Sequence, residues 1–148
     1  MKTYIPVEVE EPSKGLKITG GIISIIGGAA TLIIYIIYLF WTIIFGFIAL
    51  IFAEPRYLLL LFGTPIIFAG AVLLFVGGII GFTSASKTGA ILAMIGAATV
   101  NIFNIILFDM LTEWGEIVLR PLVIIAIPMG IIGIIGAIIL LIAAIKSP

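Results

Sequence analysis

Four long stretches without a charged residue constrain the fold of this chain more than any other feature. They cover residues 18–53, 57–86, 88–108 and 121–145. A helix that crosses a bilayer needs about 20 mostly apolar residues. Transmembrane β-strands alternate apolar and polar residues, whereas these stretches are apolar throughout. We therefore predict an all-α, integral membrane four-helix bundle, with spans at about 18–41, 57–82, 88–111 and 121–145.

Composition excludes several classes of protein. Apolar residues make up 64% of the chain and charged residues 9%, against about 45–50% and about 25% in soluble domains. Seven basic and seven acidic residues cancel, so no basic excess points to nucleic acid. The chain has no Cys and no His, which excludes thiolate and imidazole catalysis and Cys/His metal sites. We expect no catalytic, cofactor-binding or metal-binding residue, no cofactor and no nucleic-acid partner.

The basic residues predict an orientation. Loops that carry more Lys and Arg face the cytoplasm. In a four-span layout, five lysines lie on the side of the termini and two arginines on the other side: Lys2, Lys14, Lys17, Lys87 and Lys146 against Arg56 and Arg120. We therefore expect a protein of the plasma membrane with both termini in the cytoplasm.

The first and third spans contain a similar sequence. Residues 21–31 read GIISIIGGAAT and residues 89–99 read GAILAMIGAAT, 68 positions later. This similarity predicts two tandem helical hairpins related by an axis along the membrane normal. Convergence is the alternative, because Gly, Ala and Ile are common in all four spans.

Small residues recur at helical spacing in every span, and such stripes let helix backbones approach closely in membranes. Packing within one bundle is the favoured interpretation, and association between copies is the alternative. The predicted helix-packing residues are Gly20, Ser24, Gly28, Gly77, Gly81, Gly89, Ala93, Ala97, Gly133 and Ala137.

The third span also carries the candidate polar sites. Asn101 and Asn104 share one helical face. They form either a possible polar path through the membrane or, as we favour, interhelical hydrogen bonds. Asp109, Glu113 and Glu116 follow at helical spacing. This possible outer acidic stripe is a conceivable cation site, although a solvated face is the favoured interpretation.

The first apolar stretch is longer than one crossing requires. As a helix its 36 residues would extend about 54 Å, against an apolar bilayer core of about 30 Å. Tyr35, Tyr38 and Trp41 are predicted to form an outer aromatic belt, with Trp114 as its counterpart. Residues 42–53 then form an apolar extension that is interfacial, re-entrant or buried against a partner. Residues 1–16 are predicted to form an extended N-terminal arm.

Several patterns resemble those of uncharacterised, archaeal-like prokaryotic four-span membrane proteins. They are the alternating Gly-Gly and Ile runs, the restart from Lys87 to Leu92 (KTGAIL), and the glycine-rich last span that ends at Lys146. The resemblance implies the tetraspan fold and transfers no functional residue. The 35 isoleucines among 148 residues suit either an AT-rich genome or a heat-adapted archaeon.

These observations favour a non-enzymatic structural or accessory subunit of a membrane-embedded assembly. Its expected partners are the lipid bilayer and other membrane subunits or copies of itself. One alternative is a small oligomeric channel or transporter. The other is a membrane-embedded coat protein of an archaeal virus or vesicle.

Overall fold

The computed structural model describes residues 12–52, 55–84, 87–114 and 120–146, and all of them are helical. They form α1 (Pro12–Phe52), α2 (Pro55–Ser84), α3 (Lys87–Trp114) and α4 (Arg120–Lys146). Each helix contains a stretch long and apolar enough to cross a membrane. The predicted all-α bundle of four membrane-spanning helices is confirmed.

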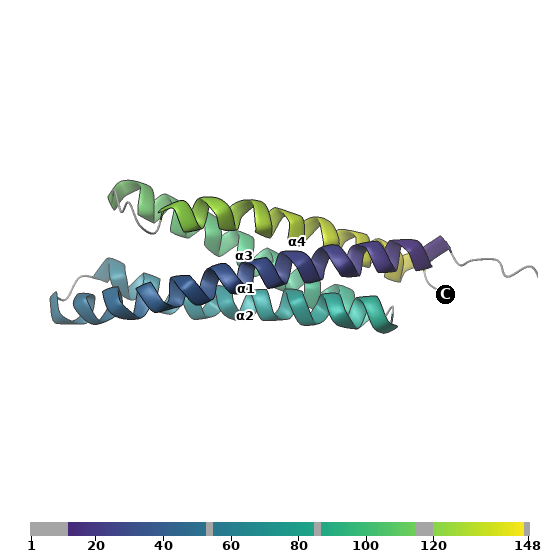
Figure 1. The fold of residues 1–148 in the computed structure, drawn as a ribbon, viewed down its shortest axis with the longest axis horizontal. Helices are drawn as coiled ribbons and strands as arrows, with labels where there is room; N and C mark the ends of the chain where they lie inside the picture. Colours follow the sequence, from purple (N-terminus) through teal and green to yellow (C-terminus); the bar gives the residue numbers. More distant parts are fainter. Residues whose placement is uncertain (1–11, 53–54, 85–86, 115–119, 147–148) are drawn as a thin grey trace, which may run out of the picture.

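The helices form a ring in chain order. α1 packs against α2 and α4, and α3 packs against the same two helices, so α1 and α3 lie diagonally opposite. The first residues of α1 and the last residues of α4 lie at the same end of the bundle (Figure 1). We call this end the terminal end and the opposite one the far end.

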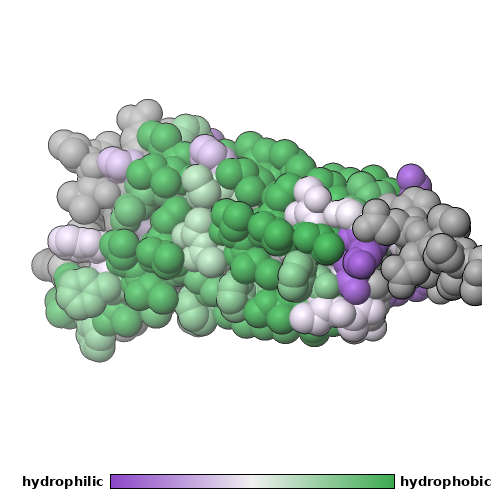
Figure 2. All heavy atoms as spheres, turned by 45° about the vertical axis from the view of Figure 1, so that its right-hand side comes forward, coloured by the Kyte–Doolittle hydropathy of each residue, from purple (hydrophilic) through white to green (hydrophobic). Residues whose placement is uncertain are grey.

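Large apolar side chains lie on the outside of the bundle and small ones inside it, which is the reverse of a soluble protein. Isoleucines on all four helices face outward, and apolar residues cover most of the surface shown in Figure 2. Alanines dominate the core toward the terminal end, with Ala90, Ala93 and Ala137 almost fully buried. Soluble proteins rarely expose continuous apolar surfaces of this kind, whereas lipid covers them without cost. The protein is therefore an integral membrane protein that contacts the bilayer.

The helix bounds differ from prediction at the two ends of α1. α1 begins at Pro12, within the segment expected to be an extended arm, because proline is favourable in the first turn of a helix. At its other end α1 continues without a break to Phe52. The surplus apolar residues are thus a straight continuation of the helix as far as the structure describes them, and not a re-entrant segment. Residues 1–11 lie outside the described part of the chain.

Two glycine contacts show that α1 and α3 occupy equivalent positions. A Cβ atom on Gly27 would meet the backbone N and Cα of Gly133 and the carbonyl oxygen of Met129, all on α4. A Cβ on Gly96 would meet the same three atoms of Leu74 and Gly70 on α2. Gly27 and Gly96 are therefore counterparts, 69 residues apart.

Burial follows the same register. Residues 18–40 and 87–109 are buried, half-buried or exposed in the same order, and the single exception is Ala29 against Ala98. The sequence similarity aligned Gly28 with Gly96, a shift of 68. The structure corrects this register by one position, because a shift of one residue turns a helix by about 100° and would exchange its faces.

The two hairpins differ in length. The contacts that relate α1 to α3 also relate α2 to α4, with a shift of 59, so Gly133 corresponds to Leu74. From Phe40 to Phe62 the chain advances 22 residues, whereas between their counterparts Asp109 and Pro121 it advances 12. The α1–α2 hairpin is therefore ten residues longer, and it reaches beyond α3 and α4 at the far end (Figure 1).

Candidate functional site

Asn101 and Asn104 of α3 lie in the far half of the bundle and connect α3 to α4. Asn104 is 1% exposed, and its Nδ2 donates to the carbonyl oxygen of Ala126 at 3.4 Å. Asn101 is half-buried, and its Nδ2 donates to the carbonyl oxygens of Ala97 at 2.7 Å and Gly130 at 3.0 Å. Both amides therefore bind the backbone of α4, which is the arrangement expected of interhelical hydrogen bonds.

Tyr35 of α1 completes this polar group. Its hydroxyl donates to Oδ1 of Asn104, so that the Asn104 amide joins three helices. Tyr35 and Asn104 are also separated by 69 residues. These two counterparts meet at the same level of the bundle, which places α1 and α3 in register along its axis.

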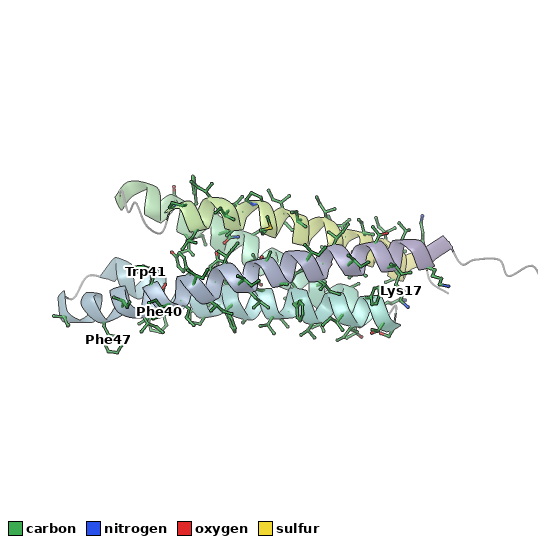
Figure 3. The ribbon with its side chains drawn as sticks, viewed as in Figure 1. Lys17, Phe40, Trp41 and Phe47 are labelled. Carbon is green, nitrogen blue, oxygen red and sulfur yellow. The ribbon has the colours of Figure 1, made fainter. Side chains whose placement is uncertain are left out.

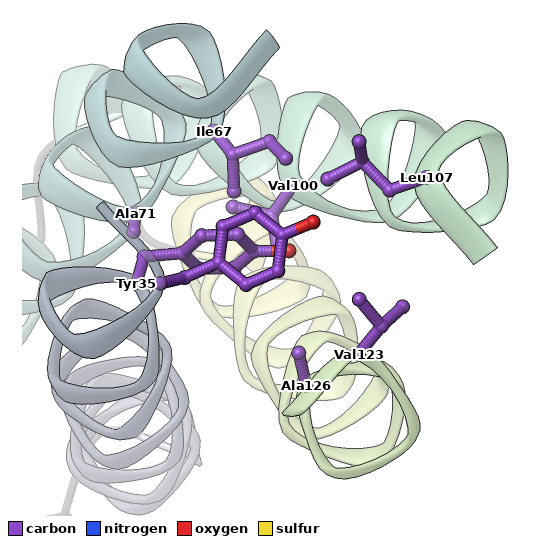
Figure 4. Close-up of a cluster of buried hydrophobic side chains, with 8 residues drawn as sticks. Tyr35, Ile67, Ala71, Val100, Leu107, Val123 and Ala126 are labelled. Carbon is purple, nitrogen blue, oxygen red and sulfur yellow. The ribbon is translucent and has the colours of Figure 1, made fainter. Parts of the chain in front are cut away.

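The predicted aromatic belt is wrong for two of its three members. Tyr35 and Tyr38 are 1% and 0% exposed, and their rings meet edge to face with centroids 5.6 Å apart. Tyr35 points into the core between Ile67, Val100 and Val123 (Figure 4), and Tyr38 belongs to the same core cluster. The two rings fill the core of the far half of the bundle, where the alanines of the other core cluster are replaced by larger side chains, and the hydroxyl of Tyr35 finds its partner there. Trp41 is half-buried against the same core cluster.

A second polar pair lies farther along α1. Thr42 and Thr64 are 3% and 0% exposed, and their hydroxyl oxygens are 3.3 Å apart. This hydrogen bond joins α1 to α2 near the start of the longer part of their hairpin. It fixes the two helices against each other where α3 and α4 approach their ends.

The predicted helix-packing residues are all buried inside one chain. A Cβ on Gly20 would lie 2.7 Å from the backbone N of Leu140, and one on Gly28 would lie 2.8 Å from the Cα of Phe75. These glycines allow contact of α1 with α4 and α2. The other eight are Ser24, Gly77, Gly81, Gly89, Ala93, Ala97, Gly133 and Ala137, which are equally enclosed between helices. None of the ten lies on the outer surface, where another copy would bind.

Ser24 is a separate case among these residues. It is fully buried, and its Oγ has no hydrogen-bond partner among the residues that the structure describes. A Cβ on Gly136 would lie 2.7 Å from this Oγ. The hydroxyl thus lies in the tight contact between α1 and α4.

The acidic stripe is described only in part. Asp109 is exposed in the last third of α3. Glu113 belongs to the same helix, but its side chain lies outside the described residues, as does the whole of Glu116. Within the described residues, no three His, Cys, Asp or Glu side chains gather as they would around a metal ion.

Comparison with known proteins gives no relative. No family model matches the chain, and no curated protein and no solved structure matches it either. The arrangement of the residues themselves therefore carries the functional argument.

Positions along the bundle axis show where the surplus length lies. Lys87 and Asp109 bound the charge-free part of α3. They are 22 residues apart, which is about 33 Å of helix and matches an apolar bilayer core of about 30 Å. Phe40 is the α1 counterpart of Asp109, and α1 continues for 12 more residues to Phe52, or about 18 Å.

Apolar side chains remain exposed on this continuation. Ile43, Phe47 and Ile51 are 46%, 66% and 75% exposed. Phe47 lies close to the far end of the molecule, and Lys17 lies close to the terminal end (Figure 3). We call residues 41–52 of α1 the α1 extension. It presents apolar surface at a level where α3 already carries a charged residue.

Proposed function

We propose that this protein is a non-enzymatic structural or accessory subunit of a membrane-embedded protein assembly. The α1 extension carries the proposal. It continues about 18 Å past the level of Asp109, which is too far for the apolar part of the same bilayer to cover it. Contact with another protein removes its exposed Phe and Ile side chains from water.

The interior of the bundle agrees with a structural role. The Asn104 amide is engaged by Tyr35 and by the backbone of α4, and both hydrogen bonds of Asn101 go to helix carbonyl oxygens. Side chains that hold helices together in this way are poor candidates for a moving ligand path. No observation favours a channel, a transporter or a coat protein over a subunit.

The proposed location is the plasma membrane, with both termini in the cytoplasm. Four lysines, Lys14, Lys17, Lys87 and Lys146, belong to helix ends at the terminal end, whereas two arginines, Arg56 and Arg120, belong to the helix starts at the far end. This distribution supports the orientation because positively charged segments are retained in the cytoplasm. The α1 extension, and with it the proposed contact with another protein, then lies on the extracytoplasmic side.

The test is purification of the tagged full-length chain from its native membranes in a mild detergent, followed by mass photometry and identification of associated chains. We expect a particle heavier than one chain. The double variant Phe47→Ala/Ile51→Ala is expected to release the chain as a monomer. Its matched control is Ile26→Ala/Ile95→Ala, which truncates side chains 54% and 51% exposed within the bilayer and should leave the assembly intact. A native monomer without any associated chain would refute the proposal.

A further inference from the structure

The outward face of α1 carries a regular series of large apolar side chains. Ile33, Phe40 and Phe47 are spaced seven residues apart, and Ile36 and Ile43 repeat the same spacing between them. Their exposed fractions range from 46% for Ile43 to 66% for Phe47. At about 100° per residue, all five fall within an arc of about 80°. We call these five residues the α1 seam.

The α1 seam lies opposite the side of α1 that packs into the bundle. Thr31, Tyr35, Tyr38 and Thr42 are buried, and they lie about half a helical turn away from the seam. The seam therefore takes no part in the contacts with α2 and α4. It is free for a contact that leaves the bundle unchanged.

Large apolar side chains at alternating spacings of three and four form the contact between two helices in a parallel coiled coil. We infer that the α1 seam pairs with the α1 seam of a second copy of this chain, about a two-fold axis along the membrane normal. This inference rests on the proposed function and names the partner of the α1 extension. Two copies inserted in the same orientation bring identical seams together in parallel, as such an interface requires.

The composition of the seam suits pairing with itself. From Ile18 to Phe52, α1 has no charged residue, so identical faces meet without repulsion. With the flanking Ile37, Ile44 and Ile51, the seam exposes the equivalent of more than four whole large side chains. At about 200 Å² each this is on the order of 900 Å², similar to the ~800 Å² that each partner buries in a standard interface.

Lipid is an insufficient partner for Ile43 and Phe47, the seam residues that lie past the level of Asp109. The outward isoleucines of α3, such as Ile102 and Ile105, end before Asp109 and lie within the bilayer. Phe47 lies seven residues past the level of Asp109, about 10 Å farther along the axis. The part of the seam toward the far end therefore needs a protein partner. The same face of a second copy provides one at the same level along the bundle axis.

Disulfide cross-linking tests this pairing directly, because the chain has no cysteine of its own. The full-length single-cysteine variants Phe40→Cys and Phe47→Cys are oxidised with copper phenanthroline in native membranes. We expect a product of twice the chain mass, at least tenfold more abundant than in the matched controls Phe62→Cys and Ile105→Cys. These control side chains are 68% and 65% exposed, on α2 and α3.

The outcomes separate the inference from the proposed function. Equal cross-linking in seam and control variants, or no self-cross-linked product, would overturn the inference. If Phe47→Cys instead joins a different protein, the subunit proposal stands and the second copy is wrong. If the chain forms no adduct and purifies as a monomer, both are wrong. Mass photometry of the double variant Phe40→Ala/Phe47→Ala, which changes only outward side chains, is expected to show a loss of the dimer. This loss would show that the cross-linked product comes from a stable dimer and not from random collision of chains in the membrane.

Discussion

Adding one methyl group at Gly27 should weaken the bundle by more than adding it elsewhere in a helix. A Cβ at this position would lie 2.7 Å from the backbone N of Gly133 and 2.8 Å from its Cα. Non-bonded atoms rest at about 3.5–4.0 Å, so α1 and α4 must move apart by about 1 Å. A gap of this size forfeits roughly a quarter to a half of the dispersion attraction at each contact along the interface.

Overpacking of a tight core costs about 1–3 kcal/mol. Because Ala has a higher helix propensity than Gly by about 1 kcal/mol, the comparison requires a control in which this gain appears alone. Gly63→Ala is such a control, because among the residues that the structure describes its Cβ would meet only Phe103 Cδ1, at 3.9 Å. We expect Gly27→Ala to be less stable than Gly63→Ala by about 1–3 kcal/mol. Gly96→Ala, the counterpart in α3, should lose a similar amount.

Unfolding of each purified variant in mixed micelles of mild detergent and increasing SDS measures these free energies. Equal stability of Gly27→Ala and Gly63→Ala would refute the close packing of α1 on α4. A costly Gly27→Ala with a harmless Gly96→Ala would instead refute the equivalence of the two hairpins.

Three further predictions concern polar groups. Asn104→Leu is expected to cost about 2–4 kcal/mol, because it removes two hydrogen bonds and leaves the buried Tyr35 hydroxyl unpaired. Tyr35→Phe should recover at least 1 kcal/mol of this loss in the double variant, and strictly additive unfolding free energies would contradict the bond. Ser84→Cys, exposed at the terminal end, should react with an impermeant maleimide only from the cytoplasmic side, and labelling of intact cells would reverse the orientation. Lys17→Met, which loses a 3.2 Å hydrogen bond to the carbonyl oxygen of Thr83, should change the midpoint of SDS unfolding little, because a cation at an exposed helix end contributes only about 0.3–1 kcal/mol.

The sequence was sufficient to predict the four spans, because their length and lack of charge admit only one kind of structure in a bilayer. It also indicated a relation between the first and third helices. The predicted register was wrong by one position. The sequence Gly-Ala-Ala-Thr occurs at residues 28–31 and at residues 96–99 and favours a shift of 68. It outweighed the less obvious similarity at the correct shift of 69. The contacts of Gly27 and Gly96, together with the order of burial along the two helices, decide which residue faces which helix.

The tyrosines show a different limit. Aromatic residues near the end of a span are frequent at the membrane interface, and sequence alone does not separate that position from the interior. Tyr35 is buried because an acceptor, Asn104, lies on the diagonally opposite helix. This pairing depends on two residues far apart in the chain, and helical spacing within one span carries no signal for it. The α1 extension, by contrast, was visible as surplus length, and the structure adds that it is helical and that its Ile43, Phe47 and Ile51 side chains are exposed.

The equivalence of the two hairpins has a consequence for the order of the chain. α1 begins and α4 ends at the same end of the bundle as the boundary between α2 and α3 (Figure 1). A circularly permuted chain that begins at Lys87 and continues from α4 through a short linker into α1 would therefore retain every contact between helices. In such a chain the α3–α4 hairpin precedes the α1–α2 hairpin, and the same helix faces still meet.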